Sequence, residues 1–105
     1  MSNSISINSI IQHNEMIRKR NIHGSIFVLD ISEHYYNDIC SLYELNETGE
    51  FIWDQIDGEK TVKKICEVLY DYVSDDIDRA VLNQDVMRFI NDLYEKRFIE
   101  VKTYG

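Results

Sequence analysis

The chain lacks proline altogether, and it has only two cysteines among its 105 residues. Without proline, no segment has the composition of a proline-rich linker, and the length is that of one folded domain. Cys40 and Cys66 lie far apart and form no CxxC pair, so a disulfide framework is not expected. The two cysteines and His13, His23 and His34 show no metal-ligand spacing either. We therefore expect reduced, mostly buried thiols, no metal site and no cofactor.

Long apolar runs are also missing. No stretch of about 18 apolar residues is present, so the sequence predicts no transmembrane helix. The first 14 residues lack the basic start and the continuous apolar stretch of a signal peptide, which makes a cytoplasmic location the expectation. Residues 1–14 are predicted to form a flexible N-terminal tail, with a short edge strand at Ile5–Ile7 left open, and residues 15–105 to form the folded domain.

Basic residues are scarce relative to acidic ones. The chain has 11 Lys and Arg against 19 Asp and Glu, which gives a net charge of −8. This charge repels phosphate backbones and argues against non-specific nucleic-acid binding. It keeps the protein soluble and favours a basic partner.

The first half of the chain has the residue pattern of β-strands, rich in β-branched and aromatic side chains. The expected strands are Met16–Arg20, Ser25–Ile31 and Ile39–Leu45, with a turn at His23-Gly24. In the last of these strands, Tyr43 and Leu45 are predicted to share one face, and Leu42 and Glu44 the other.

The second half has the period of helices. Asn46, Thr61 and the segment 74–76 are suitable N-caps for three successive helices, and Gly58 suits the end of the first. The buried stripe of the third helix is predicted to contain Ile77, Val81, Leu82, Val86, Phe89, Ile90 and Leu93. A short last strand is expected at Phe98–Val101. The fold class is therefore α+β: a three-stranded antiparallel sheet followed by three helices, like a winged helix-turn-helix.

Three runs of residues carry a family resemblance. They are Leu45-Asn46-Glu47-Thr48-Gly49 followed by Ile52-Trp53, then Thr61-Val62 with Ile65, and then Asp85-Val86, Phe89-Ile90 and Leu93 before Phe98-Ile99. This succession closely resembles the PqqD-like family, also called RiPP recognition elements, from about Ser25 to Val101. The family often has Gly-Leu-Ile where this chain has Arg97-Phe98-Ile99. Because a left-handed cap is less comfortable at Arg than at Gly, the third helix is expected to end differently.

The resemblance implies a non-catalytic peptide-binding protein. Such a domain binds the leader region of a ribosomally synthesised precursor peptide and delivers it to a modifying enzyme, such as a radical-SAM maturase or a leader peptidase. The leader adds as a strand to the edge of the third strand, and its side chains enter a groove beside the third helix. Carried to this chain, the implied peptide-binding residues are Ile39, Cys40, Ser41, Leu42, Tyr43, Glu44, Leu82, Asp85, Val86, Arg88, Phe89 and Asp92.

Each of these residues also has an ordinary structural interpretation. Leu82, Val86 and Phe89 have the spacing of a core stripe, and Tyr43 suits either the core or the groove. Asp85 and Arg88 can equally form a solvated surface pair. Outside this set, Trp53 is more typical of a core residue than of an enzyme contact.

Two other functions compete with peptide binding. A winged-helix DNA-binding regulator has the same architecture, but its reading helix normally carries an excess of Lys and Arg. A structural subunit of a maturase complex requires no peptide at all. An open strand edge additionally favours a weak or strand-exchanged homodimer.

Overall fold

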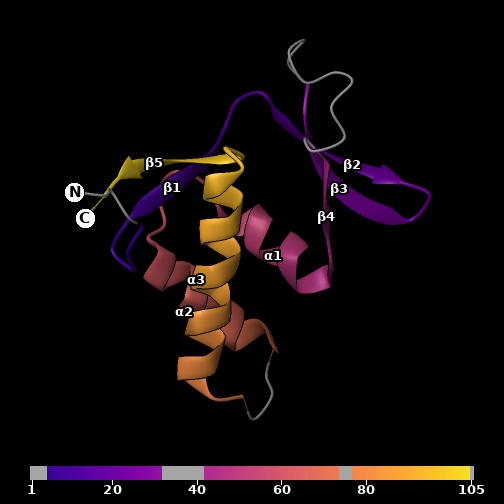
Figure 1. Cartoon of the computed structure of the whole chain (residues 1–105). Helices are drawn as coiled ribbons and strands as arrows, with labels where there is room; N and C mark the ends of the chain where they lie inside the picture. Colours follow the sequence, from indigo (N-terminus) through magenta and orange to yellow (C-terminus); the bar gives the residue numbers. More distant parts are fainter. Residues whose placement is uncertain (1–4, 32–41, 74–76, 105) are drawn as a thin grey trace.

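The computed structural model of the protein describes residues 5–31, 42–73 and 77–104. It has the predicted α+β fold, with a three-stranded antiparallel sheet of order β2-β3-β4, a separate pair β1-β5 and three helices (Figure 1). The elements are β1 (Ile10–His13), β2 (Ile17–Ile22), β3 (Ser25–Asp30), β4 (Leu42–Leu45), α1 (Glu47–Gln55), α2 (Val62–Val73), α3 (Arg79–Glu95) and β5 (Ile99–Thr103).

The hairpin of β2 and β3 turns where the sequence predicts it. His23 and Gly24 both have positive φ, 53° and 88°. Two consecutive residues with positive φ make the kind of two-residue turn whose twist matches that of the flanking strands. The side chain of Asn21 accepts a hydrogen bond from the Gly24 amide and supports this turn. The hairpin extends away from the helices (Figure 1).

The predicted caps hold α1 and α2 at the expected residues. The side chain of Asn46 accepts a hydrogen bond from the Gly49 amide at 2.7 Å, and Thr61 Oγ1 accepts one from the Lys64 amide at 3.1 Å. For α3 the cap differs from the prediction, because the carboxylate of Asp78 accepts from the Ala80 amide. The segment 74–76 lies outside the described residues.

The end of α3 also differs from the prediction. Arg97 adopts the left-handed conformation, with a φ of 64°. The Arg97 amide donates to the Tyr94 carbonyl and the Phe98 amide to the Leu93 carbonyl, which is the Schellman pattern. Phe98 and Leu93 are both buried. The burial of Phe98 accounts for this ending despite the strain at Arg97, because the left-handed residue turns Phe98 back onto the core.

The segment before residue 15 is not a flexible tail over its described part. β1 pairs antiparallel with β5, Ile11 is fully buried, and Ile5 is 5% exposed. The hydroxyl of the buried Ser9 donates to the Tyr104 carbonyl at 3.0 Å. The sequence signal for this strand is weak because its partner, β5, lies almost ninety positions further along the chain.

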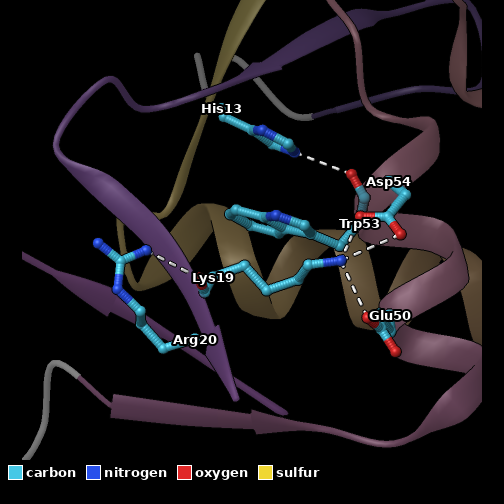
Figure 2. A network of polar contacts seen from close by, with 6 residues as sticks. All are labelled: His13, Lys19, Arg20, Glu50, Trp53 and Asp54. Atoms are coloured by element: carbon cyan, nitrogen blue, oxygen red, sulfur yellow. Dashed lines mark hydrogen bonds and ion pairs between the residues drawn. The ribbon is translucent and has the colours of Figure 1, made fainter.

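A second set of contacts joins β1 and β2 to α1. The imidazole of His13 stacks on Trp53 with ring centroids 3.9 Å apart, and its Nε2 lies 2.8 Å from the Trp53 carbonyl oxygen (Figure 2). Burial lowers the pKa of His13. On β2, the ammonium of Lys19 donates to both Glu50 and Asp54 at 2.9 Å (Figure 2). Trp53 is 3% exposed and belongs to the core, as the sequence favours.

Candidate functional site

β4 is an outer strand of the three-stranded sheet. Within the part of the chain that the structure describes, it pairs with β3 alone, in the register Ile26↔Leu45 to Leu29↔Leu42. A strand at the end of a sheet has one row of N–H and C=O groups directed away from its neighbour, and an extended peptide can pair with that row. Of the predicted edge strand Ile39–Leu45, residues 42–45 are described, and they form this outer strand.

Tyr43 connects this edge to α3. Its hydroxyl donates to a carboxylate oxygen of Asp92 at 2.9 Å, and its ring meets Phe89 edge-on with centroids 6.2 Å apart. Phe98 lies on another side of the same ring, 6.1 Å away, and the Lys96 ammonium lies 5.7 Å from it. Burial, together with the bond to Asp92, raises the pKa of Tyr43 to about 12. Tyr43 therefore fixes the distance between β4 and α3 as a neutral hydrogen-bond donor.

An apolar cavity of about 340 Å³ opens between the helices, close to where β4 leads into α1. Its walls come from α1 with its N-cap, the end of α2, Ile77 and the N-terminal two thirds of α3. The lining residues are Asn46, Thr48, Gly49, Ile52, Leu69, Val73, Ile77, Leu82, Asp85, Val86 and Phe89. A cavity of this size with mostly apolar walls and one carboxylate suits an apolar side chain of a bound peptide.

Gly49 allows α1 to lie against Phe89. A Cβ atom added at Gly49 would lie 3.1 Å from Asn46 Oδ1 and 3.4 Å from the Phe89 ring. The run Asn46–Gly49 therefore has two roles, because it caps α1 and also forms part of the cavity wall. From the sequence only the cap at Asn46 is predicted, and the glycine three residues after the cap is the signal that indicates the close approach.

The structure brings six of the predicted site residues together. Tyr43, Asp92 and Phe89 form one contact group, and Phe89, Leu82, Val86 and Asp85 line the cavity. Leu82 and Val86 are 4% and 1% exposed, so they form the cavity wall from within the core. Phe89 is only partly buried, in contrast to Leu82 and Val86.

Other predicted site residues lie apart from this group. Leu42 and Glu44 are exposed and point to the opposite face of the sheet from Tyr43, since side chains alternate along a strand. Only their backbone groups belong to the edge. Ile39, Cys40 and Ser41 lie outside the described residues.

Arg88 lies on the solvent side of α3. Its side chain is 79% exposed, and its guanidinium is 3.7 Å from the Asp85 carboxylate, a surface pair that contributes little to stability. Arg88 and Asp92 line a shallow hollow with Asn91 and Glu95 further along the helix. Acidic and basic residues are mixed on this helix, which is unlike the excess of cations that a DNA-reading helix needs.

Other kinds of chemistry find little support among the described residues. Across this part of the chain, histidine, cysteine and carboxylate side chains nowhere gather in threes that fit a metal ion. Burial raises the pKa of the Cys66 thiol, which leaves it a poor nucleophile. Within the same ranges, no helix combines the length and apolar character needed to cross a membrane.

Comparisons with known proteins agree with this geometry. The family model described as "Coenzyme PQQ synthesis protein D (PqqD)" matches residues 28–99, which is more than half of the chain. Among solved structures, the chain is similar to one titled "TbiB1 in Complex with the TbiA(beta) Leader Peptide", with a TM-score of 0.65 and 16% identity. That match covers 90% of this chain and 98% of the other, and at this identity it concerns the fold. No curated protein matches the chain.

Proposed function

The chain belongs to the PqqD family, and from this premise we propose that it binds the leader region of a ribosomally synthesised precursor peptide without catalysing a reaction. The observation that carries the proposal is the open edge of β4 beside an apolar cavity that reaches Phe89. The solved structure with a similar fold is named for its complex with a leader peptide. We place the binding domain at residues 15–105, with β1 of the preceding segment attached to it through β5.

The leader would add to β4 as a fourth strand. Backbone pairing along the edge contributes affinity that depends little on sequence, whereas side chains of alternate residues meet different surroundings. Those on the Tyr43 side face α3, and an apolar one can enter the cavity beside Phe89. Asp85 at the cavity wall favours a leader with a basic residue near its apolar anchor, in keeping with the net charge of −8.

The bound leader would then be delivered to a separate modifying enzyme, such as a radical-SAM maturase or a leader peptidase. Holding the leader raises the local concentration of the attached core peptide at that enzyme. Since precursor peptides of this kind are made on cytoplasmic ribosomes, the cytoplasm is the proposed place of action.

A fluorescence-anisotropy titration with a labelled leader peptide, encoded in the same gene cluster, tests the proposal. We expect Phe89→Ala to weaken leader binding about thirtyfold, as for a central aromatic contact of an interface. The matched control is Phe51→Ala, because Phe51 is a similarly half-buried phenylalanine that stacks on Tyr72 and does not line the cavity. No binding by the wild type to any leader of the cluster, or equal loss in both variants, would reject the proposed site.

A further inference from the structure

The three-stranded sheet has a second face, which is directed away from the helices. A leader bound at the edge of β4 would leave this face free. Directly opposite residues in an antiparallel pair share a face, and successive residues alternate between faces. Tyr43, Val28 and Lys19 face the helices, since they contact α3, the core and α1 respectively. The register then assigns the other face, here called the outer face, to Met16, Arg18, Arg20, Ile22, Phe27, Leu29, Ile31, Leu42 and Glu44.

The outer face is apolar and accessible. Met16 and Ile31, which meet at one end of the hairpin, are 38% and 43% exposed, and Ile22 and Leu42 are 43% and 42% exposed. Phe27 lies between them and is not among the residues that pack against the core. Several large apolar side chains that share one exposed face, rimmed by charges, are typical of a protein-protein contact surface.

Two arginines give this face a positive rim along β2. Among the described residues, neither Arg18 nor Arg20 lies within ion-pair distance of a carboxylate. The Arg18 guanidinium donates to the Ile17 carbonyl instead. The Arg20 guanidinium donates to the Lys19 carbonyl (Figure 2). Lys19, between them in sequence but on the other face, has two carboxylate partners. Since the described part of the chain gives neither arginine a carboxylate partner, these two cations on an apolar face favour a partner protein with acidic residues, even though the chain as a whole has a net charge of −8.

A second copy of the chain fits this face poorly. A two-fold contact of the outer face with itself brings four arginines, Arg18 and Arg20 of each copy, onto one interface with only the two Glu44 carboxylates, so positive charge is left in excess. A different protein with an acidic rim around an apolar patch has no such conflict. The outer face also continues onto β4 through Leu42 and Glu44. It therefore borders the edge at which the leader is proposed to bind.

We propose that the outer face docks the modifying enzyme, through an acidic-rimmed apolar surface on that enzyme. This inference rests on the proposed function, because a leader strand added to β4 would extend the same face. Its side chains that point away from α3 would lie beside Leu42 and Glu44 and contact the docked enzyme. The domain thus holds one side of the leader in its groove and presents the other side to the enzyme.

The test measures enzyme and leader binding separately. Biolayer interferometry with the maturation enzyme encoded in the same gene cluster is run on the wild type, on the double variant Arg18→Glu/Arg20→Glu and on Ile31→Asp. The matched control is Lys63→Glu/Lys64→Glu, which reverses two exposed cations on α2. We expect the Arg18/Arg20 variant and Ile31→Asp each to weaken enzyme binding at least about tenfold, and the wild-type affinity to fall with rising salt. Leader binding, titrated without enzyme, is expected to stay unchanged in all variants.

Three outcomes would overturn the inference. The first is a wild type that binds no enzyme with or without leader. The second is equal enzyme binding in the outer-face variants and the α2 control. The third is a dimer on a sizing column that Ile31→Asp dissociates, because the face would then belong to a second copy. If the leader fails to bind the wild type in the enzyme-free titration, the proposed function is wrong. Enzyme binding to the outer face is measured separately and tests only the docking inference.

Discussion

At one edge of the three-stranded sheet, β4 lies beside α3 and an apolar cavity, whereas at the other edge β2 carries Arg18, Lys19 and Arg20 in succession. Both are outer strands of the same antiparallel sheet, so their backbones offer the same kind of hydrogen-bonding groups. The two strands differ in the helix that packs against each of them and in the charge of their side chains. Strand addition therefore depends on the side chains around an edge as much as on the unpaired backbone groups of the edge.

The charge on β2 protects its edge. If a second β2 paired antiparallel with it, cations of the two strands would lie opposite one another, and like charges in that position destabilise the pair. Lysine and arginine on edge strands are a common means of preventing aggregation. β4 has no such run, and Tyr43 holds it at a fixed distance from a helix with apolar contacts to offer.

The largest predicted difference between the two edges is in amide hydrogen exchange. When leader peptide saturates the protein, exchange of the outward-directed amides of β4 is expected to slow at least about tenfold, because they become paired, while those of β2 stay unchanged. Exchange measured by NMR with and without peptide distinguishes the edges. Protection of β2 in place of β4 would show that the peptide binds at the wrong edge for the proposed groove.

The next prediction concerns the ion pairs that join β2 to α1. Lys19→Met is expected to lower the free energy of unfolding by about 1 kcal/mol, because it leaves Glu50 and Asp54 facing each other without their shared cation. The hydrogen bonds to these carboxylates raise the pKa of Lys19, so its contribution is present below its unfolded pKa and is lost as the pH rises through the higher folded value. Urea denaturation measures the change, and Lys63→Met is an exposed-lysine control. Equal effects in both variants would contradict this account.

A smaller effect is predicted when the charge on β2 is removed. The double variant Arg18→Thr/Arg20→Thr removes the repulsion between opposed cations of two paired β2 strands. Each opposed pair costs a few tenths of a kcal/mol, so the loss of these pairs is expected to strengthen self-association roughly severalfold. Sedimentation velocity over a range of concentrations measures the shift. Unchanged association in this variant would mean that charge is not what protects the β2 edge.

The last predicted effect is confined to strongly alkaline solution and comes from the ionisation of Tyr43. Because its folded pKa is raised to about 12, the folded state keeps a proton that the unfolded state releases near its ordinary value of 10.0. Tyr43 therefore contributes fully to stability below about pH 10, and the contribution falls as the pH rises from there toward about 12. Denaturation of the wild type and Tyr43→Phe across this range tests the sign: the stability difference between them narrows with rising pH if the prediction is right.

Much of the fold follows from local sequence patterns. The β-branched and aromatic residues of Ser25–Ile31 predict β3 to within one residue, and the caps at Asn46 and Thr61 predict the starts of two helices. These features depend on neighbours a few positions away, so a single sequence contains them. The family resemblance adds the edge of β4 and the face of α3.

Other parts depend on contacts between distant segments. β1 was assigned to a tail because its partner β5 lies at the far end of the chain. Arg97 adopts a conformation that its own chemistry disfavours, since the burial of Phe98 stabilises the Schellman ending as a whole. Asp78 caps α3 in place of the predicted segment.

The sequence by itself determined which segments form strands and helices and which residues cap the first two helices, because those features follow from local patterns with periods of two and 3.6 residues. The edge of β4 and the helix beside it came from the family resemblance. Only the tertiary structure decided that the Tyr43 hydroxyl binds Asp92 and that Gly49 lies against Phe89. It also decided that Arg18 and Arg20 share a face with Met16 and Ile31. The reason is physical: a local pattern specifies the face of an element, whereas the register and packing of elements distant in the chain specify what that face meets.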